Sequence, residues 1–519
     1  MTLPRPLLAA LVALCGCMTA RDDTTWVLPA DPEAIPTRGG SQEPPQQALV
    51  LNSGGPAAVT SLWTPGSGPL QLGHVLAAVD ASFPLLSVAR QEQILKQAKQ
   101  IKALGSFDLK LSAQAQWNLE GFYENHTAGV MLEQATGLWG TRVLGGYRVG
   151  DGDFDLTFDG KRRINNGGEF SAGVAVPLLR GGEIDPARRD LLTAGHERDM
   201  ADSKLESLRL KFSAEAAEAY WDWVAAGQEQ QVARALLNLA VVRQRGIEEA
   251  FANGALAEIE VLDNRRLVVE REGLVISARR KAEKAALALA LFLRDASGQP
   301  LQAPESAQLA TLPPGEALLS SALEADLELA LQRRPDLRNL TQQQARERVT
   351  LGAANNELLP QLDLTVLASQ DLDRRRPSVT KGEFELVAGL KFEFPLQNRK
   401  ARGLVLESEA RLGQLGEQLR LARDQVALEV RDAFSALQAA YAREQQARQA
   451  AELAQRVADA ERQRFGLGDS TVLNLNLREA AAARAQLGVV SASRDYWTAA
   501  AKYSAAVGLL PLSPGLGAP

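Results

Sequence analysis

Two long stretches of the chain, residues 187–299 and 396–510, contain no proline, although the sequence carries 24 prolines over 519 residues. Proline inside a helix removes a backbone hydrogen bond and clashes with the preceding turn, so long runs without it are typical of long helices. Each run comes soon after a Pro-Leu pair, at Pro177 and at Pro395, and is broken once by a Phe-x-x-Gly motif. The sequence therefore predicts an internal duplication that contains two long helical hairpins.

The two Phe-x-x-Gly motifs, Phe251–Gly254 and Phe465–Gly468, are predicted to form the turns of these hairpins. We expect the first hairpin over about residues 183–295 and the second over about residues 398–510. A helix that runs from the start of either range to its turn is about 100 Å long at 1.5 Å per residue. Such a helix cannot bury its apolar seam in a small globule, so we expect it to pack against helices of equal length, from its own hairpin and from other subunits.

Four shorter segments alternate apolar and polar residues, a period that indicates β-strands. They are predicted at about residues 107–117, 169–177, 361–370 and 383–394. Residues 118–168, between the first two segments, are rich in glycine and aspartate and are predicted to form a loop. A soluble sheet with one face in water shows the same alternation, but four strands of this length with charged groups on one face favour the tilted strands of a membrane barrel.

The N-terminal residues have the pattern of a bacterial lipoprotein signal peptide, in which a basic residue and a short apolar core precede a Leu-Cys-Gly-Cys sequence. On this interpretation residues 1–16 are removed and Cys17 carries a covalent lipid. An ordinary cleaved signal peptide without a lipid is the alternative. Residues 17–69 are rich in proline and are predicted to form an extended linker behind the anchor.

The rest of the chain divides into two structural repeats and a short tail. We place the first repeat at residues 70–316, the second at 317–511 and the tail at 512–519. Each repeat is expected to contain two strands followed by one long hairpin.

Charge and composition exclude several other classes of protein. The formal net charge of −6 argues against a nucleic-acid binder, which normally shows a basic excess. No run of 18 apolar residues occurs, so the sequence predicts no membrane-spanning helix. The three histidines, His74, His126 and His196, are scattered without the spacing of a metal site. We therefore expect no enzyme activity, no metal and no cofactor apart from the lipid on Cys17.

Four kinds of segment, in their order and spacing, resemble the TolC family of outer-membrane efflux proteins over nearly all of the chain after residue 70. These segments are Arg334–Leu337, Leu359–Leu364, the Pro-Leu pairs that end two of the strands, and the two Phe-x-x-Gly turns. In addition, Ser470–Leu475 is similar to the family's segment that opens its last long helix. Each motif alone is degenerate, whereas their order within a duplicated chain is specific.

The resemblance implies a mainly helical fold with a membrane β-barrel. Three copies would form a homotrimer, in which each chain gives four strands to a shared twelve-stranded barrel and its coiled-coil hairpins to an α-barrel that crosses the periplasm. It implies a passive exit duct in the outer membrane for small molecules or proteins, within a tripartite efflux or type I secretion system. A periplasmic adaptor (membrane fusion) protein would connect this duct to an inner-membrane pump. The alternative is a periplasmic coiled-coil adaptor or scaffold lipoprotein without a pore.

The resemblance also implies contact sites at the hairpin turns. Phe251, Gly254, Phe465 and Gly468 would lie at the periplasmic tips, where members of the family meet the adaptor. A purely structural interpretation is the alternative, in which each glycine ends a helix and each aromatic ring packs beside it.

Residues just past each turn are candidates for a periplasmic gate. They are Glu258 and Glu260 in the first repeat and Ser470 and Asn474 in the second. Glu260 matches an acidic position of the family, whereas Asn474 stands where the family has an Asp and Ser470 where it can have an Arg. We expect a closed state with fewer ionic contacts, and an entrance that selects cations less than a ring of carboxylates does. Solvent-facing polar residues without a gating role are the alternative.

Overall fold

The structure, a computed structural model, describes residues 62–65, 68–121, 124–153, 167–304, 312–317, 322–372 and 384–511. These residues belong to one structural unit, which spans Val59–Pro519. The expected signal peptide, the expected lipidation site Cys17, most of the expected linker and the tail at 512–519 lie outside the described residues.

Short helices precede the strands in both repeats. They are α2 (Leu72–Ser82), α3 (Pro84–Leu104) and the 3-10 turn η1 (Gly105–Phe107) in the first repeat, and α6 (Ala322–Arg333) and α7 (Pro335–Asn356) in the second. Pro84 separates α2 from α3 and Pro335 separates α6 from α7, because the residue before a proline disfavours the helical conformation. Among the described helices none alone has the length and apolar character to cross a membrane, and α2 together with the bent continuation through α3 and η1 passes that test as a pair.

The long helices form two hairpins, as the proline-free runs predict. The first consists of α4 (Pro186–Ala252) and α5 (Glu258–Ala290), the second of α8 (Arg399–Gly466) and α9 (Val472–Val507). The longer arms contain 67 and 68 residues, so each measures about 100 Å. α4 begins after Asp185, whose carboxylate accepts a hydrogen bond of 2.7 Å from the Arg188 backbone N–H and caps the helix.

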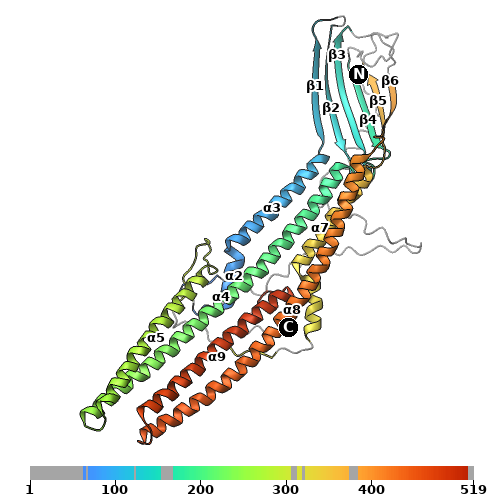
Figure 1. Cartoon of the computed structure of the whole chain (residues 1–519). Coiled ribbons are helices and arrows are strands. Elements are labelled where there is room, and N and C mark those ends of the chain that lie inside the picture. The colour runs from blue at the N-terminus through green and yellow to red at the C-terminus, as the bar shows by residue number, and fades with distance from the viewer. Residues whose placement is uncertain are drawn as a thin grey trace, which may run out of the picture. The chain divides into compact units, whose positions relative to one another are not determined.

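The two hairpins pack on one another as well as within themselves. α4 contacts α5, α9, α7 and α3, and α8 contacts α9 and α7 (Figure 1). One apolar cluster includes Phe83, Phe212 and Tyr220 and holds α2 and α3 against α4. A second includes Val430 and Phe434 of α8, and joins this helix to α6 and α9. From Val426 to Glu444 the buried residues of α8 step by threes and fours, as expected for the buried face of a long amphipathic helix.

The strands form one sheet in which every strand is antiparallel to its neighbours. They are β1 (Lys110–Asn118), β2 (Asn125–Ala135), β3 (Arg142–Gly152), β4 (Glu169–Pro177), β5 (Gln361–Asp371) and β6 (Phe384–Glu393). The order in the sheet is the order in the chain, so β1 and β6 are its edges. The pairing of β4 with β5 joins the first repeat to the second.

The prediction of four strands per chain was wrong, because the sheet has six. β2 and β3 lie within residues 118–168, which the sequence predicts as a loop. Glycine occupies several positions of these strands, including Gly129, Gly145 and Gly146, and adds no apolar side chain to an alternating pattern. β2 is instead stabilised by backbone pairing with β1 along the whole length of β1, which the alternation of side chains does not reveal.

One face of the sheet is apolar across every strand. Register places the following representatives, one from each strand in order, on that face: Leu111, Val130, Tyr147, Val174, Val366 and Leu390. Leu111 and Leu390 are each 69% exposed. Within the described residues, η1 is the one helical element with more than marginal contact to a strand. The sheet therefore presents an apolar face that no helix covers.

A buried carboxylate ties the segment at 312–317 to α8 and α9. Glu444 is fully buried, and its Oε2 accepts a hydrogen bond of 2.9 Å from the Gly315 backbone N–H. Its Oε1 accepts hydrogen bonds from the Ser493 hydroxyl at 2.7 Å and the Arg448 guanidinium at 2.6 Å. Both carboxylate oxygens are thus bonded, as the burial of a charge requires.

Replacement of this carboxylate should destabilise the fold. We expect Glu444→Ala to lower the free energy of unfolding by about 3 kcal/mol, because it leaves buried donors without their acceptor. Glu452→Ala is the matched control, since Glu452 lies on the same helix, is 62% exposed and pairs with Arg456. The control should change stability by less than about 0.5 kcal/mol. Denaturant unfolding of the purified protein in detergent measures both, and equal stability of the two variants would contradict the role of Glu444.

Candidate functional site

The turns that end the two long hairpins follow α4 and α8, which lead away from the sheet (Figure 1). A glycine in each turn has a left-handed backbone, with φ of +73° at Gly254 and +79° at Gly468. No atom lies within 4 Å of the place where a Cβ would stand on either glycine. The backbone conformation, and not crowding, therefore requires glycine at these positions. Their N–H groups donate to the carbonyl oxygens of Phe251 at 2.9 Å and Phe465 at 3.0 Å.

Both turns present apolar side chains to their surroundings. Phe251 is 43% exposed, Phe465 is half-buried, and Leu467 is 84% exposed. Sequence analysis singled out the two aromatic residues and missed Leu467. Its position between two glycines, in the turn itself, is the signal that could have found it.

The four gate candidates lie in or beside the first turn of the returning helix. Glu258 and Glu260 are in the first turn of α5, where the helix dipole favours carboxylates. Asn474 is exposed in the first turn of α9, and its backbone N–H donates to the capping threonine hydroxyl at 3.3 Å. The Ser470 hydroxyl donates to the Glu461 carboxylate, so it joins the two arms of its own hairpin. Their role in a gate stays a prediction.

A salt bridge near these turns joins the first hairpin to the second. Arg243 of α4 donates through Nη2 to Glu479 Oε1 of α9 at 2.6 Å, and through Nη1 to the side-chain oxygen of Asn476. The Glu479 side chain is 2% exposed and accepts a second hydrogen bond, of 3.3 Å, from Arg462 of α8. Arg243 lies about ten residues before the turn, or about 15 Å along the helix. This cluster, Arg243 with Asn476, Glu479 and Arg462, is called the hairpin tie below.

Polar groups are also buried between α4 and α5. Asn264 and Arg271 are 0% and 2% exposed. The Asn264 amide donates to the Ala240 carbonyl at 3.2 Å and to the Gln244 side chain at 2.7 Å. Arg271 donates to the Leu236 carbonyl at 2.7 Å, and burial lowers the pKa of its guanidinium. The ends of both hairpins are therefore held together by polar contacts as well as by apolar packing.

Sequence analysis did not identify the hairpin tie, although the sequence holds a signal for it. The buried residues in the first part of α9 are Val472, Leu475, Asn476, Glu479 and Ala482. These positions step by threes and fours along one face of the helix, and two of them are polar. A polar residue in the apolar seam of a long helix indicates a buried polar partner on a neighbouring helix.

The Arg334–Leu337 motif forms the junction between α6 and α7. The Arg334 guanidinium donates to both Asp336 carboxylate oxygens, at 3.1 and 2.9 Å, and pairs with Glu429 of α8 at 2.9 Å. It also donates to the Ala506 carbonyl of α9 at 3.2 Å. Burial alone would raise the pKa of the Asp336 carboxyl, but the hydrogen bonds and charge of Arg334 lower it overall. The motif thus fastens this junction to the second hairpin.

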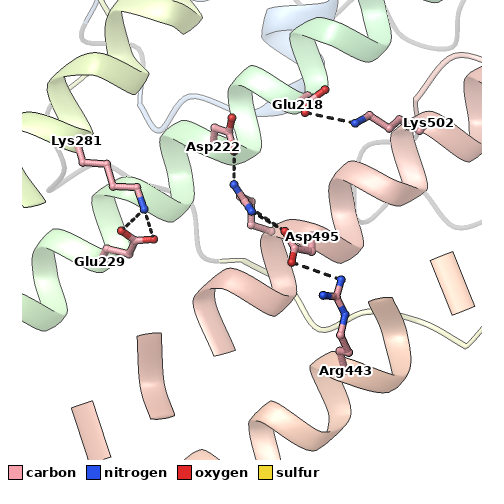
Figure 2. A network of polar contacts seen from close by, with 8 residues as sticks. Glu218, Asp222, Glu229, Lys281, Arg443, Asp495 and Lys502 are labelled. Atoms are coloured by element: carbon pink, nitrogen blue, oxygen red, sulfur yellow. Dashed lines mark hydrogen bonds and ion pairs between the residues drawn. The ribbon is translucent and has the colours of Figure 1, made fainter. Parts of the chain in front are cut away.

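A charged groove of about 830 Å³ lies between α4 and the second hairpin. Figure 2 shows the ion pairs beside it, in which Arg443 of α8 approaches Asp495 at 3.5 Å. Arg494 of α9 pairs with Asp495 at 2.6 Å and with Asp222 of α4 at 3.2 Å. Because these side chains are partly exposed, each pair contributes little to stability. The lining of the groove combines charges of both signs with small apolar side chains.

The described residues contain no group of three or more His, Cys, Asp or Glu side chains placed to hold a metal ion. Two of the histidines make local contacts. His74 Nδ1 accepts a hydrogen bond of 3.2 Å from the Gln71 backbone N–H, and His196 Nδ1 lies 2.9 Å from the Gln342 side-chain oxygen. The features that distinguish this region are the hairpin turns, the hairpin tie and the charged groove.

Loss of the hairpin tie should let the hairpin ends separate. Arg243→Gln removes the charge that bridges α4 to α9, so we expect a longer and broader distance between spin labels at residues 252 and 466. Pulsed electron paramagnetic resonance, with labelled chains diluted in unlabelled ones, measures this distance. Arg266→Gln is the control, because Arg266 is 67% exposed and pairs within α5. An unchanged distance distribution in Arg243→Gln would contradict the tie.

Known proteins resemble this chain in sequence over one region and in fold over most of its length. Residues 327–509, within the second repeat, match the outer membrane efflux protein family. No curated protein matches the sequence. Solved structures, by contrast, match over most of the chain.

Three solved structures illustrate the likeness. The Campylobacter jejuni CmeC outer membrane channel is 15% identical, with a TM-score of 0.56 over 84% of this chain and 85% of that one. The Neisseria gonorrhoeae MtrE outer membrane channel, in its open state, is 14% identical, with a TM-score of 0.58 over 85% and 90%. The Vibrio cholerae outer membrane protein VceC is 17% identical, with a TM-score of 0.55 over 84% and 96%. The resemblance to the TolC family of outer-membrane efflux proteins is therefore confirmed, by the sequence of the second repeat and by the fold of the chain.

Proposed function

We propose that the chain is the outer-membrane channel of a tripartite efflux or type I secretion system, a passive conduit for small molecules or proteins. The observation that carries the proposal is the apolar face of the sheet, which is continuous from β1 to β6 and is covered by no described helix. Contact between water and an apolar surface of this size is unfavourable, whereas lipid tails cover it without that penalty. An adaptor or scaffold without a pore would leave this face uncovered.

The sheet of one chain does not close by itself, because about eight strands are the minimum for a barrel. Three copies around one axis would join their sheet edges in the outer membrane and gather their long hairpins around a common tunnel. Helices of about 100 Å suit a tunnel that extends far into the periplasm. The fold shared with the CmeC and MtrE outer membrane channels supports this arrangement.

The membrane end of the chain and the hairpin turns would contact different partners. A lipid on Cys17 would add a second attachment to the outer membrane beside that of the sheet. At the other end, the turns with Phe251, Gly254, Phe465 and Gly468 would meet the periplasmic adaptor, which connects the channel to an inner-membrane pump. Exposed apolar side chains on these turns support that role.

The entrance beside the turns would form the gate. Glu258, Glu260, Ser470 and Asn474 would surround it, and the hairpin tie a short distance along the helices would hold each chain's two hairpins together in the closed state. Asn474 is neutral, so the second repeat adds no carboxylate at this position. The entrance would accordingly select cations less than a full ring of carboxylates does.

Electrical recording tests both the channel and the gate. The purified protein should produce discrete openings in a planar lipid bilayer. Asn474→Asp should shift the reversal potential in a KCl gradient towards cation selectivity, because it adds one carboxylate per copy at the entrance. Gln414→Glu adds the same charge in the first quarter of α8, far from the turn, and should shift it less. Absence of any openings in the unmodified protein would contradict the channel, and equal selectivity of Asn474→Asp and the unmodified protein would contradict the gate.

Site-specific cross-linking tests the adaptor contact. A photo-reactive residue at position 467, which is 84% exposed at the turn, should capture a periplasmic protein in cells that export. The same residue at position 452, which is 62% exposed and lies about four helical turns before the end of α8, is the control. Mass spectrometry should identify the protein captured at position 467 as an adaptor with its own coiled-coil hairpin. Equal capture at both positions, or none at 467, would contradict the contact.

A further inference from the structure

We propose that β2 and β3 are strands of the membrane barrel itself, so that three copies of this chain close a ring of eighteen strands and not of twelve. The proposal deepens the proposed function and rests on it. It starts from the six strands that one chain contributes, where the family resemblance implies four. The partner of each sheet edge is the opposite edge of a second copy of the same chain.

Ion pairs on the polar face bind the β2–β3 hairpin into the sheet. Arg142 of β3 lies 3.3 Å from Glu133 of β2. Arg148 of β3 lies 2.5 Å from Glu169 of β4, whose side chain is only 4% exposed. The hairpin therefore pairs along both of its sides, through its backbone and through these charges.

The turn of the hairpin is fixed as well. The Thr136 backbone N–H donates to the Thr141 carbonyl at 2.8 Å and closes the turn. Inside it, the Trp139 ring lies against Gly182, where an added Cβ would approach the ring to 2.6 Å. Gly182 stands between β4 and α4, so the turn packs at the helical side of the sheet. Because the β2–β3 hairpin is held at both sides and at its turn, it is part of the sheet and not a loop folded over it.

The apolar face continues through the middle of β2, with Val130 and Leu132, and of β3, with Val143, Tyr147 and Val149. Leu132 of β2 lies opposite Leu111 of β1. On the other side of the hairpin, the Tyr147 ring of β3 contacts the Phe170 ring of β4, with centroids 5.9 Å apart. A segment that folds into the lumen or over the outer rim has no need of this alternation. A strand in contact with lipid does.

The directions of the edge strands permit closure between copies. Because all neighbours are antiparallel and the strand number is even, β1 and β6 run in opposite directions. β1 of one copy beside β6 of the next is therefore another antiparallel pair. Insertion of two strands preserves this condition, whereas insertion of one would not. Every residue of β1 is exposed, as are most of those of β6.

The stagger of the sheet matches that of a membrane barrel. Lys110 is the first residue of β1 at the helical end of the sheet. If its paired residue is followed from strand to strand, the last partner is Val387 on β6, six residues before Glu393, the end of β6 on the helical side. The sheet thus slips by about one residue per strand. With about 3.4 Å per residue and about 4.8 Å between strands, this slip corresponds to a tilt of about 35°. Membrane barrels tilt their strands by about 35–45°.

Symmetry and charge then select a register for the joint between copies. Placing Lys110 opposite Glu393 of the next copy brings opposite charges together at the helical end. In the same register Ala113 lies opposite Leu390, and both belong to the apolar face. This register continues the slip of one residue per strand around the ring, as a closed barrel of constant tilt requires.

A ring of eighteen strands has consequences for the exit of the channel. Barrel diameter grows roughly linearly with strand number, so the ring is about one and a half times as wide as one of twelve strands, with about twice the cross-section. Barrels of about this strand number enclose an aqueous channel. The membrane segment therefore suits bulky, hydrated cargo, and the helical entrance remains the narrower part of the path.

Disulfide trapping tests the joint between copies. The variant with Ala113→Cys and Leu390→Cys should form linked dimers and trimers on oxidation, and each single variant should form none. Ala113→Cys with Lys391→Cys is the matched control, because residue 391 lies on the opposite face of β6. Equal cross-linking of the two pairs, or none in either, would overturn the proposed joint.

Imaging tests the strand number directly. Cryo-electron microscopy of the full chain in lipid nanodiscs should show three copies and eighteen strands. A variant in which a short turn replaces residues 119–168 should show twelve strands, since β1 and β4 are antiparallel and can pair directly. A ring of twelve strands in the unmodified protein, whether from three copies with β2 and β3 outside it or from two copies, would overturn the proposal. Particles without any membrane ring would instead contradict the proposed function. If the shortened variant does not fold, the strand number of the unmodified protein and the cross-linking of the cysteine pairs still test the proposal.

Discussion

The pairing of β4 with β5 is the constraint on which the rest of the structure depends. These strands belong to different repeats, and their register places Val174 beside Val366 and Ala172 beside Ala368. Side chains of a strand alternate between its two faces, so this one register aligns the apolar face of the first repeat with that of the second. It also brings the start of α4 close to the end of α7, because α4 follows β4 and α7 leads into β5. The hairpins that extend from the sheet are thereby set side by side.

Neither long helix can bury its apolar residues alone, so each depends on the helices packed beside it. Each long arm is about 100 Å long, whereas the second arms α5 and α9 have 33 and 36 residues and are about half as long. The rest of each long arm packs on α7, and α4 also packs on α3 and α9. Polar groups interrupt the apolar packing where the partners must be fixed in register. Glu444 fastens the connecting segment to the second hairpin, and the tie between Arg243 and Glu479 fastens the hairpins to each other near their turns. Buried charges of this kind tolerate few alternative partners, so they favour one alignment of the helices.

The sequence predicts the helical part of the fold well, because proline, glycine and the Phe-x-x-Gly motifs act locally. The turns at Gly254 and Gly468 follow from the need of glycine for a left-handed backbone. The β2–β3 hairpin escapes prediction because its order comes from pairing with β1 and β4, and glycines obscure its alternation. The hairpin tie escapes it for a related reason. Which polar residues of a seam meet depends on how two hairpins are aligned, and residues 243 and 479 are far apart in the chain.

The central claim is that the uncovered apolar face belongs in a membrane and that several copies share it. The most direct test is single-particle imaging of the full chain, extracted from outer membranes and placed in lipid nanodiscs. The account predicts threefold particles in which the sheets form a closed ring within the disc and the helices form a shaft of about 100 Å outside it. Single chains, soluble particles, or a sheet that lies outside the lipid disc would contradict the account.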